Sequence, residues 1–389
     1  MNKVEITDSI LYVGVNDRDI DLFEGQYVVP EGVSYNSYLI MDEKIALMDT
    51  VDVRKSEEWL ANIKVILGTR HPDYLVVSHM EPDHAGSIAA VVEEFPGMKI
   101  VGNAKTFTFM GQFFGFDVES KKVVVAEGDV LSLGKHNLKF VMAPMVHWPE
   151  VMMSYETEEK ILFSADGFGK FGALDADEEW ACEARRYYFN IVGKYGAQVQ
   201  AVLKKLAGVE VNAICPLHGP VLKENLAYYI GLYDTWSAYR PEDEGVLVAY
   251  ASIYGNTAKA AKAIAEYLKE KGAKKVAVTD LARDDMAEAI EDAFRYDKMV
   301  LACSTYDGGI FPCMEDFLSH LKAKNYQKRT VALIENGTWA PMAGKKMREI
   351  LDGMKDIKVL ENMVTVRSSV KKETEEALNA LAEELLKAE

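Results

Sequence analysis

Short apolar runs separated by turns characterise the first half of the chain. The runs at 38–41, 45–49 and 74–78 are too short for helices and are typical of buried strands. Helices are predicted at 56–67 and 87–94, and further strands at 137–143, 160–164 and 211–215. This mixture favours two sheets packed face to face with helices outside, an αββα arrangement, although periodicity alone leaves other α+β arrangements open.

The second half has a more regular pattern. Pro, Gly and three acidic residues interrupt both periodicities at 240–245, so we place a boundary there and expect domains at 1–241 and 242–389. Beyond it, strands are predicted at 246–250, 275–279, 298–303 and 330–334, and helices at 257–271, 312–321, 343–354 and 371–387. This alternation predicts a doubly wound parallel sheet, which binds ligands at the carboxyl ends of its strands.

Composition narrows the possible partners. With 389 residues, 49% of them hydrophobic, the chain is long enough for two globular domains. A net charge of −17 and the lack of any long Lys/Arg run argue against nucleic acid or an anionic membrane as partner. The N-terminal residues lack an apolar core of signal-peptide length, and no window approaches membrane length, so a cytoplasmic protein is expected.

The cysteines exclude two kinds of metal site. The four of them form no C-x-x-C pair, so neither a rubredoxin-type iron site nor a structural zinc site is expected. If this protein carries out redox chemistry, its electrons therefore come from another molecule. The four cysteines are Cys182, Cys215, Cys303 and Cys313.

Candidate metal ligands follow several predicted strands. After the run at 74–78 come His79, Glu81, Asp83 and His84, with the first three at alternate positions, so an extended or looping backbone can direct several of them into one space. Three further candidates each follow another predicted strand, and these are His147, Asp166 and His218. Strand ends that converge in this way predict a binuclear metal site.

The composition of this set indicates how two metals would share it. Each metal can take two histidines and one private carboxylate, which leaves Asp166 to bridge them. Three buried carboxylates without metal would be prohibitively unfavourable. In the commoner hydrolase pattern H-x-H-x-D-H the second position is a neutral imidazole, whereas here it is Glu81. An anionic oxygen donor stabilises the more highly charged state of a metal, so this position favours redox iron over zinc.

A second candidate site follows the first strand of the second half. Hydroxyls at Ser252 and Thr257, a turn at Gly255 and the free amides of a helix start can cradle a phosphate, although an ordinary helix cap would have the same appearance. Two further strand ends offer matching turns, where Tyr306 and Trp339 present planes for a flat ring. The candidate contacts are Ser252, Ile253, Tyr254, Gly255, Asn256, Thr257, Ser304, Thr305, Tyr306, Asp307, Gly308, Gly309, Asn336, Gly337, Thr338 and Trp339.

These two sets of residues, in this order along the chain, resemble the flavodiiron proteins, also called A-type flavoproteins. The resemblance implies a metallo-β-lactamase-like di-iron domain followed by a flavodoxin-like domain that binds FMN. It also implies reduction of dioxygen to water, of nitric oxide to nitrous oxide, or of both. By resemblance, His79, Glu81 and His147 would bind the first iron, Asp83, His84 and His218 the second, and Asp166 would bridge, while Tyr195 would present a hydroxyl to the substrate pocket.

The resemblance also implies partners. The chain would form a head-to-tail homodimer or a dimer of dimers, with the FMN of one subunit beside the iron pair of the other. Electrons would come from rubredoxin or a similar donor, with a reduced deazaflavin as the alternative direct donor. Two alternatives remain open at this point: a zinc hydrolase fused to a flavodoxin-like domain, and a flavin electron carrier whose lactamase-like half is a docking scaffold.

Overall fold

The structure is a computed structural model that describes residues 4–388. Residues 1–3, part of the N-terminal stretch considered for a signal peptide, and residue 389 lie outside the described residues. By its contacts the chain divides into two compact units, Met1–Tyr188 with Ala197–Asp234, and Phe189–Gly196 with Thr235–Glu389. The predicted boundary between residues 241 and 242 lies a few residues beyond this division and stays a prediction.

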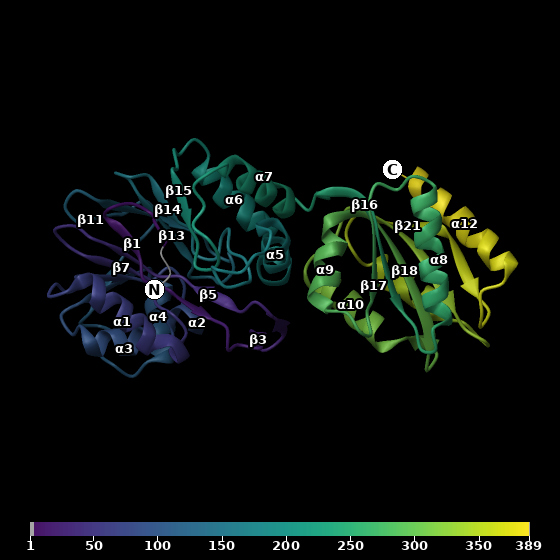
Figure 1. The fold of residues 1–389 in the computed structure, drawn as a ribbon, viewed down its shortest axis with the longest axis horizontal. Coiled ribbons are helices and arrows are strands. Elements are labelled where there is room, and N and C mark those ends of the chain that lie inside the picture. The colour runs from purple at the N-terminus through teal and green to yellow at the C-terminus, as the bar shows by residue number, and fades with distance from the viewer. Residues whose placement is uncertain (1–3, 389) are drawn as a thin grey trace. The chain divides into compact units, whose positions relative to one another are not determined.

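Two sheets form the first unit (Figure 1). The first has the order β1-β6-β7-β8-β9-β10 and the second β11-β12-β13-β14-β15. The strands are β1 Ile10–Tyr12, β6 Tyr38–Ile40, β7 Ala46–Met48, β8 Tyr74–Val76, β9 Lys99–Gly102, β10 Lys122–Val124, β11 Val130–Ser132, β12 Asn137–Met142, β13 Met152–Glu156, β14 Ile161–Phe163 and β15 Ala213–Cys215. Two short ribbons pair β2 Val15–Asp17 with β5 Val33–Tyr35, and β3 Leu22–Phe23 with β4 Tyr27–Val28.

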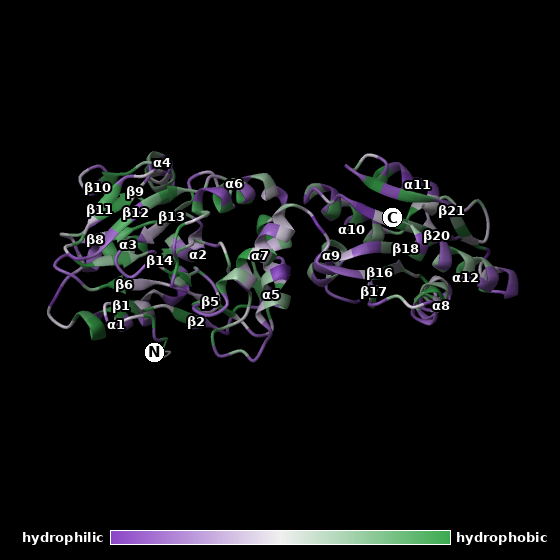
Figure 2. Ribbon diagram, turned by 90° about the horizontal axis from the view of Figure 1, so that it is seen from above, coloured by the Kyte–Doolittle hydropathy of each residue, from purple (hydrophilic) through white to green (hydrophobic). Residues whose placement is uncertain are grey.

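One core joins the two sheets. Its buried cluster takes Tyr38 and Met48 from the first sheet and Phe140 and Phe163 from the second, and the rings of Tyr38 and Phe163 meet at 5.5 Å. Figure 2 shows green, hydrophobic ribbon around β9, β12 and β13. Helices lie outside: α1 Ser56–Leu67, α2 Pro82–Ala85, α3 Ile88–Glu94, α4 Ala104–Phe113, α5 Trp180–Tyr187, α6 Gly196–Leu206 and α7 Leu226–Ser237. The predicted αββα arrangement is confirmed.

A five-stranded parallel sheet in the order β17-β16-β18-β20-β21 forms the second unit, with α8 and α12 on one face and α9 and α10 on the other (Figure 1). The predicted doubly wound sheet is confirmed, and its order is that of flavodoxin-like folds. Its strands are β16 Asp243–Ala251, β17 Val276–Asp280, β18 Tyr296–Tyr306, β19 Gly309–Ile310, β20 Arg329–Asn336 and β21 Ile357–Val366, and its helices are α8 Asn256–Glu270, α9 Met286–Arg295, α10 Pro312–Ala323, α11 Ala343–Leu351 and α12 Lys372–Lys387.

In the second unit the strands β16, β18 and β20 are longer than predicted, and β19 and β21 were not predicted. The strand predicted at 298–303 continues as β18 to Tyr306 because Thr305 and Tyr306 pair with the short antiparallel strand β19. The edge strand β21 was not predicted, since its buried and exposed residues alternate without a continuous apolar run. Among residues 4–388, no helix has the length and apolar character needed to cross a lipid bilayer.

The core of the second unit gives a test of the packing. Ile264 of α8 is fully buried against the sheet and α12, so Ile264→Ala should lower the free energy of unfolding of this unit by about 2–5 kcal/mol. Val278→Ala is the control, because Val278 is 38% exposed on the edge strand β17 and should change the free energy by less than roughly 1 kcal/mol. Urea unfolding of the whole chain, followed by circular dichroism, measures both. Equal effects of the two substitutions would contradict this packing.

Candidate metal centre and cofactor cradle

The seven candidate ligands lie after the ends of strands that belong to both sheets. His79 follows β8 of the first sheet, while His147, Asp166 and His218 follow β12, β14 and β15 of the second. Asp83 and His84 do not lie in the extended or looping backbone that the sequence predicted, because Pro82–Ala85 forms one helical turn, α2. Proline is favoured at the first position of a helix, and Pro82 occupies it here.

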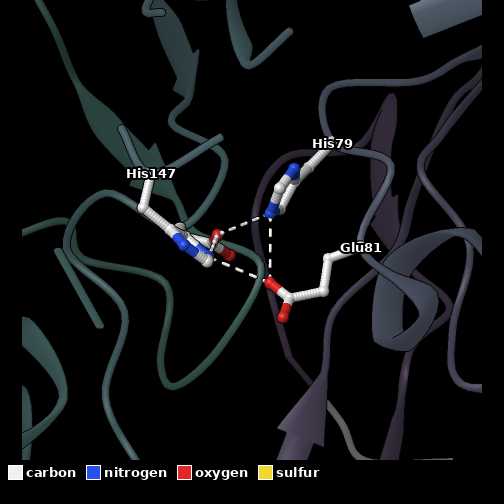
Figure 3. A group of neighbouring side chains, drawn as sticks. His79, Glu81 and His147 are labelled. Carbon is white, nitrogen blue, oxygen red and sulfur yellow. Dashed lines mark hydrogen bonds and ion pairs between the residues drawn. The ribbon is translucent and has the colours of Figure 1, made fainter. Parts of the chain in front are cut away.

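His79, Glu81, His147 and Asp166 form the first cluster (Figure 3). Glu81 Oε2 lies 2.9 Å from His147 Nε2 and 3.2 Å from His79 Nε2. Asp166 Oδ2 lies 3.3 Å from His79 Nε2 and 3.4 Å from His147 Nε2. Two imidazole nitrogens and two carboxylate oxygens therefore surround one point.

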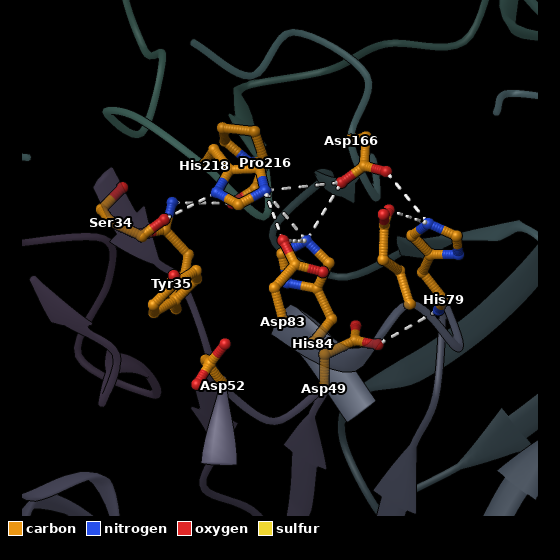
Figure 4. A network of polar contacts seen from close by, with 12 residues as sticks. Ser34, Tyr35, Asp49, Asp52, His79, Asp83, His84, Asp166, Pro216 and His218 are labelled. Carbon is orange, nitrogen blue, oxygen red and sulfur yellow. Dashed lines mark hydrogen bonds and ion pairs between the residues drawn. The ribbon is translucent and has the colours of Figure 1, made fainter. Parts of the chain in front are cut away.

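Asp83, His84 and His218 form the second cluster (Figure 4). Asp83 Oδ2 lies 3.2 Å from Nε2 of both His84 and His218, and these two nitrogens are 3.0 Å apart. The other oxygen of Asp166, Oδ1, lies 3.2 Å from His84 Nε2 and 4.0 Å from His218 Nε2. Asp166 thus presents one oxygen to each cluster, as a bridging carboxylate does.

These separations fit metal coordination. Donor atoms bound to one ion at about 2.0–2.2 Å lie roughly 2.9–3.5 Å apart for angles from right-angled to tetrahedral. Among the described residues, the buried oxygens of Asp83 and Asp166 have no hydrogen-bond partner. Buried carboxylate oxygens without donors are strongly unfavourable unless a cation satisfies them. The chemistry of the donor set therefore suits two divalent ions.

Three residues that the sequence analysis did not identify hold these ligands. Glu150 Oε1 lies 2.8 Å from His79 Nδ1, and His218 Nδ1 donates to the carbonyl of Ser34 at 2.8 Å. Asp49 accepts hydrogen bonds from the backbone of Ser78 and His79. Of these three residues, Glu150 could have been noticed in the sequence. It is an acid between His147-Trp148 and an apolar strand, and an acid buried there needs a partner.

Carboxylates raise the pKa values of the first-cluster histidines. Burial lowers the pKa of His147, but the nearby carboxylates of Asp166 and Glu81 outweigh this effect and raise it to about 9. The pKa of His79 is raised well above its usual value, because Asp166, Glu150 and Glu81 together outweigh burial. The site therefore attracts positive charge, whether as protons or as metal ions.

A cavity gives access to the ligands. It has a volume of about 380 Å³, and its lining includes Phe23 and Tyr35 beside Glu81 and Asp83. The ring of Phe23 stands edge-on to that of His218, with centroids 5.4 Å apart. Small molecules can therefore reach the metal positions along a partly apolar wall.

Aromatic residues surround the ligands more closely than the sequence indicated. Tyr187 lies 5.5 Å from the ring of His218, and Trp148 lies 5.2 Å from that of His79. Burial, followed by the charges of Asp166, raises the pKa of Tyr187 well above its usual value, so its hydroxyl stays protonated. Tyr195 ends the short 3-10 helix Gly193–Tyr195, which belongs to the second unit, and its role at the metals stays a prediction.

In the second unit, the three predicted turns follow the adjacent parallel strands β16, β18 and β20. Ser252 Oγ accepts from the Gly255 amide at 3.1 Å, and Thr257 Oγ1 lies 2.8 Å from Ser304 Oγ. Gly255 precedes α8 with a φ of 87°, a conformation that favours glycine. These hydroxyls and the helix start form a concave group of donors that suits a phosphate.

Two exposed rings lie at the ends of β18 and β20. Trp339 is 81% exposed and Tyr306 45% exposed, so both faces remain available for a flat ring. Tyr254 is 93% exposed, so its side chain is not part of the buried group of hydroxyls. The sequence analysis missed Ser368 after β21, which exchanges hydrogen bonds with Asn336 and donates to Thr338 Oγ1 at 2.9 Å.

Comparisons with known families match both units. A model described as ODP family beta lactamase matches residues 33–219, and one described as a flavodoxin domain matches residues 247–375. The second matched range contains all three turns of the candidate cradle, and the first contains all seven candidate ligands.

Individual relatives resemble nearly the whole chain. The rubredoxin-oxygen oxidoreductase of Megalodesulfovibrio gigas is 30% identical over 91% of this chain and 90% of its own length. An anaerobic nitric oxide reductase flavorubredoxin of Aliivibrio salmonicida is 31% identical over 86% of this chain and 69% of its own length. The crystal structure of the flavodiiron protein from Giardia intestinalis matches with a TM-score of 0.93 at 26% identity, over 99% of this chain and 96% of that one.

The raised pKa of His147 makes metal binding pH-dependent. Because the folded pKa of about 9 lies above the usual 6.5, the metal-free protein holds this proton at about pH 7 and loses it above about pH 9. Metal must displace the proton, so ion binding should release more protons at about pH 7 than at about pH 10. Calorimetry of Co²⁺ binding to chelator-treated protein, in buffers of different ionisation enthalpy, counts the protons. Equal release at both pH values would contradict this electrostatic account.

Proposed function

The chain belongs to the flavodiiron protein family and is an oxidoreductase, and from this premise we propose that it reduces dioxygen to water, nitric oxide to nitrous oxide, or both. The observation that supports this most directly is the position of Asp166, whose two oxygens face two separate sets of imidazole nitrogens. Two metal ions that share one bridging carboxylate would lie close enough together for a diatomic molecule to fit between them.

The proposal assigns seven residues to two iron ions. His79, Glu81 and His147 would hold the first ion and Asp83, His84 and His218 the second, with Asp166 between them. Glu81 favours iron, because an anionic oxygen donor stabilises a ferric ion better than the imidazole of the zinc hydrolases does. The separations between the donor atoms suit metal distances, so these residues fit the ions.

FMN would occupy the cradle of the second unit. Ser252, Thr257 and Ser304 would bind its terminal phosphate together with the amides at the start of α8, and Tyr306 and Trp339 would flank the ring. When bound, reduced FMN would supply two electrons and the two ferrous ions together two more, the four that dioxygen needs to become two molecules of water with four protons. The chain's own residues exclude bulk water from the metals, since five of the seven ligands are buried.

The remaining site assignments complete the proposal. We place the di-iron domain at 1–241 and the FMN domain at 242–389. Tyr195 remains our candidate for a hydroxyl that faces the substrate. The cavity beside Glu81 and Asp83, whose lining includes Phe23 and Tyr35, is large enough to admit a gas molecule.

Replacing the bridge tests the proposal. The purified protein should hold about two irons and one FMN per chain, and Asp166→Ala should hold fewer irons and turn over dioxygen and nitric oxide at least ~100-fold more slowly. Asp177→Ala, which changes an exposed acid of the same unit, is the control and should behave like the unchanged protein. Elemental analysis, flavin absorbance and gas electrodes give the readouts.

Each other result of this experiment has a clear meaning. Full reductase activity in Asp166→Ala would favour the electron carrier, and zinc in place of iron would favour the hydrolase. A higher rate with one gas than with the other identifies the substrate.

Partners are part of the proposal. We expect a separate donor, rubredoxin or a similar small redox protein, because the cysteines supply no rubredoxin-type site within this sequence. We also expect a head-to-tail homodimer or a dimer of dimers that brings the FMN of one subunit to the iron pair of the next. Sedimentation at assay concentration should show this assembly, and a fully active monomer would refute it.

A further inference from the structure

The carboxylate of Glu150 lies directly behind the first metal cluster. Glu150 is fully buried in the loop between β12 and β13, three residues after His147. Its Oε1 lies 2.8 Å from His79 Nδ1 and accepts from the backbone amide of Met80 at the same distance. Its own carbonyl accepts from Asn103 Nδ2, which fixes the loop. His79 is thereby held as the tautomer with Nδ1 protonated and Nε2 free for metal.

The hydrogen-bonding surroundings of Glu150 suit a carboxylate anion. Two N–H groups converge on Oε1, and among residues 4–388 no acceptor lies within reach of Oε2. A protonated acid would need such an acceptor for its O–H group, whereas a carboxylate needs only positive charge nearby. Two divalent ions supply that charge, and His79 links Glu150 to the nearer one.

The second cluster has no carboxylate hydrogen-bonded to the far nitrogen of a histidine. His218 Nδ1 donates to the neutral carbonyl of Ser34, and His84 Nδ1 has no hydrogen-bond partner among the described residues. The buried carboxylate of Asp49 lies near His84, but it accepts from the backbone amides of Ser78 and His79. Glu150 is therefore the main asymmetry between the two clusters in hydrogen bonding to the imidazoles.

We propose that Glu150 is a positioning residue that makes the two irons inequivalent, so that the iron held by His79 is the first to be oxidised. A carboxylate on the far nitrogen of an imidazole increases the electron density that the ligand gives the metal, and its charge stabilises the ferric ion. When one electron passes from the diferrous pair to a one-electron oxidant such as ferricyanide, the ferric charge stays beside His79. This inference rests on the proposed iron pair and adds an order of oxidation to it.

Glu150→Gln tests the proposal because the amide oxygen can still accept from His79 and Met80 while the charge is lost. Anaerobic redox titration of the iron-loaded, FMN-loaded protein measures two couples, diferrous to mixed-valent and mixed-valent to diferric. The first couple should shift by about tenfold in its equilibrium constant, which is about 59 mV for one electron, toward the ferrous state. The second couple should shift less, because the second electron comes from the iron beside His218.

Glu156→Gln is the matched control. Glu156 is also a fully buried acid of β13 that accepts two backbone N–H groups, those of Glu158 and Glu159, but it contacts none of the seven ligands. It should leave both couples unchanged. An equal effect of both substitutions would mean that the shift reflects general charge loss, and would overturn the proposal.

The remaining outcomes are decisive too. An unchanged first couple in Glu150→Gln with two irons bound would show a purely structural role, and a larger shift in the second couple would place the ferric charge at the other cluster. If Glu150→Gln fails to hold two irons, Glu150→Asp is titrated instead: a smaller shift in the same direction supports the proposal and no shift overturns it. If the unchanged protein binds no iron, the proposed function itself fails, which is a separate result.

Discussion

Asp166 is fully buried between two sheets, and its two oxygens face imidazoles on opposite sides, with no hydrogen bond from the described residues to offset its charge. A carboxylate in this position needs cations, and the structure arranges the other ligands to hold them. β14 and β15 pair in parallel, which brings Asp166 and His218 to one sheet edge, while β8 of the other sheet brings His79 to the same place. The shared core of the two sheets is therefore also what fixes the distance between the ligands.

In the second unit the candidate site also lies at the ends of strands, but it suits an anion rather than cations. Phosphate binding is favoured when the hydrogen-bond donors lose little conformational entropy. The free amides at the start of α8 and the buried hydroxyls of Thr257 and Ser304 meet this condition, because they are ordered before anything binds. Strands β16, β18 and β20 keep register over six or more residue pairs, so their ends lie together. One chain thus joins a rigid cradle for an anion to a rigid cluster for cations.

Local patterns were sufficient to predict much of this from the sequence. Helix α1 at Ser56–Leu67 has the predicted bounds, since its apolar spacing and acidic first turn are properties of its own residues. The seven candidate ligands could be selected because each follows an apolar strand, and the structure brings them together in two adjoining clusters. Ser34 could not, because it contributes its backbone carbonyl, which any residue has. Ser368 acts through contacts with Asn336 and Thr338, 30 or more residues away in the chain, and no local pattern marks such contacts.

Charge explains why the site contains several buried acids. With neutral imidazoles, the carboxylates of Glu81, Asp83, Asp166 and Glu150 match the charge of two divalent ions, so burial of the reduced centre is far less unfavourable than that of any part alone. Loss of the metals would leave the acids uncompensated, and the raised pKa of His147 shows how protons then take the place of the ions. Oxidation disturbs the balance in the other direction, since each ferric ion adds a positive charge that the four acids do not offset. The anion nearest to that added charge decides where it is most stable, and in this fold the fourth acid lies behind only one of the two clusters.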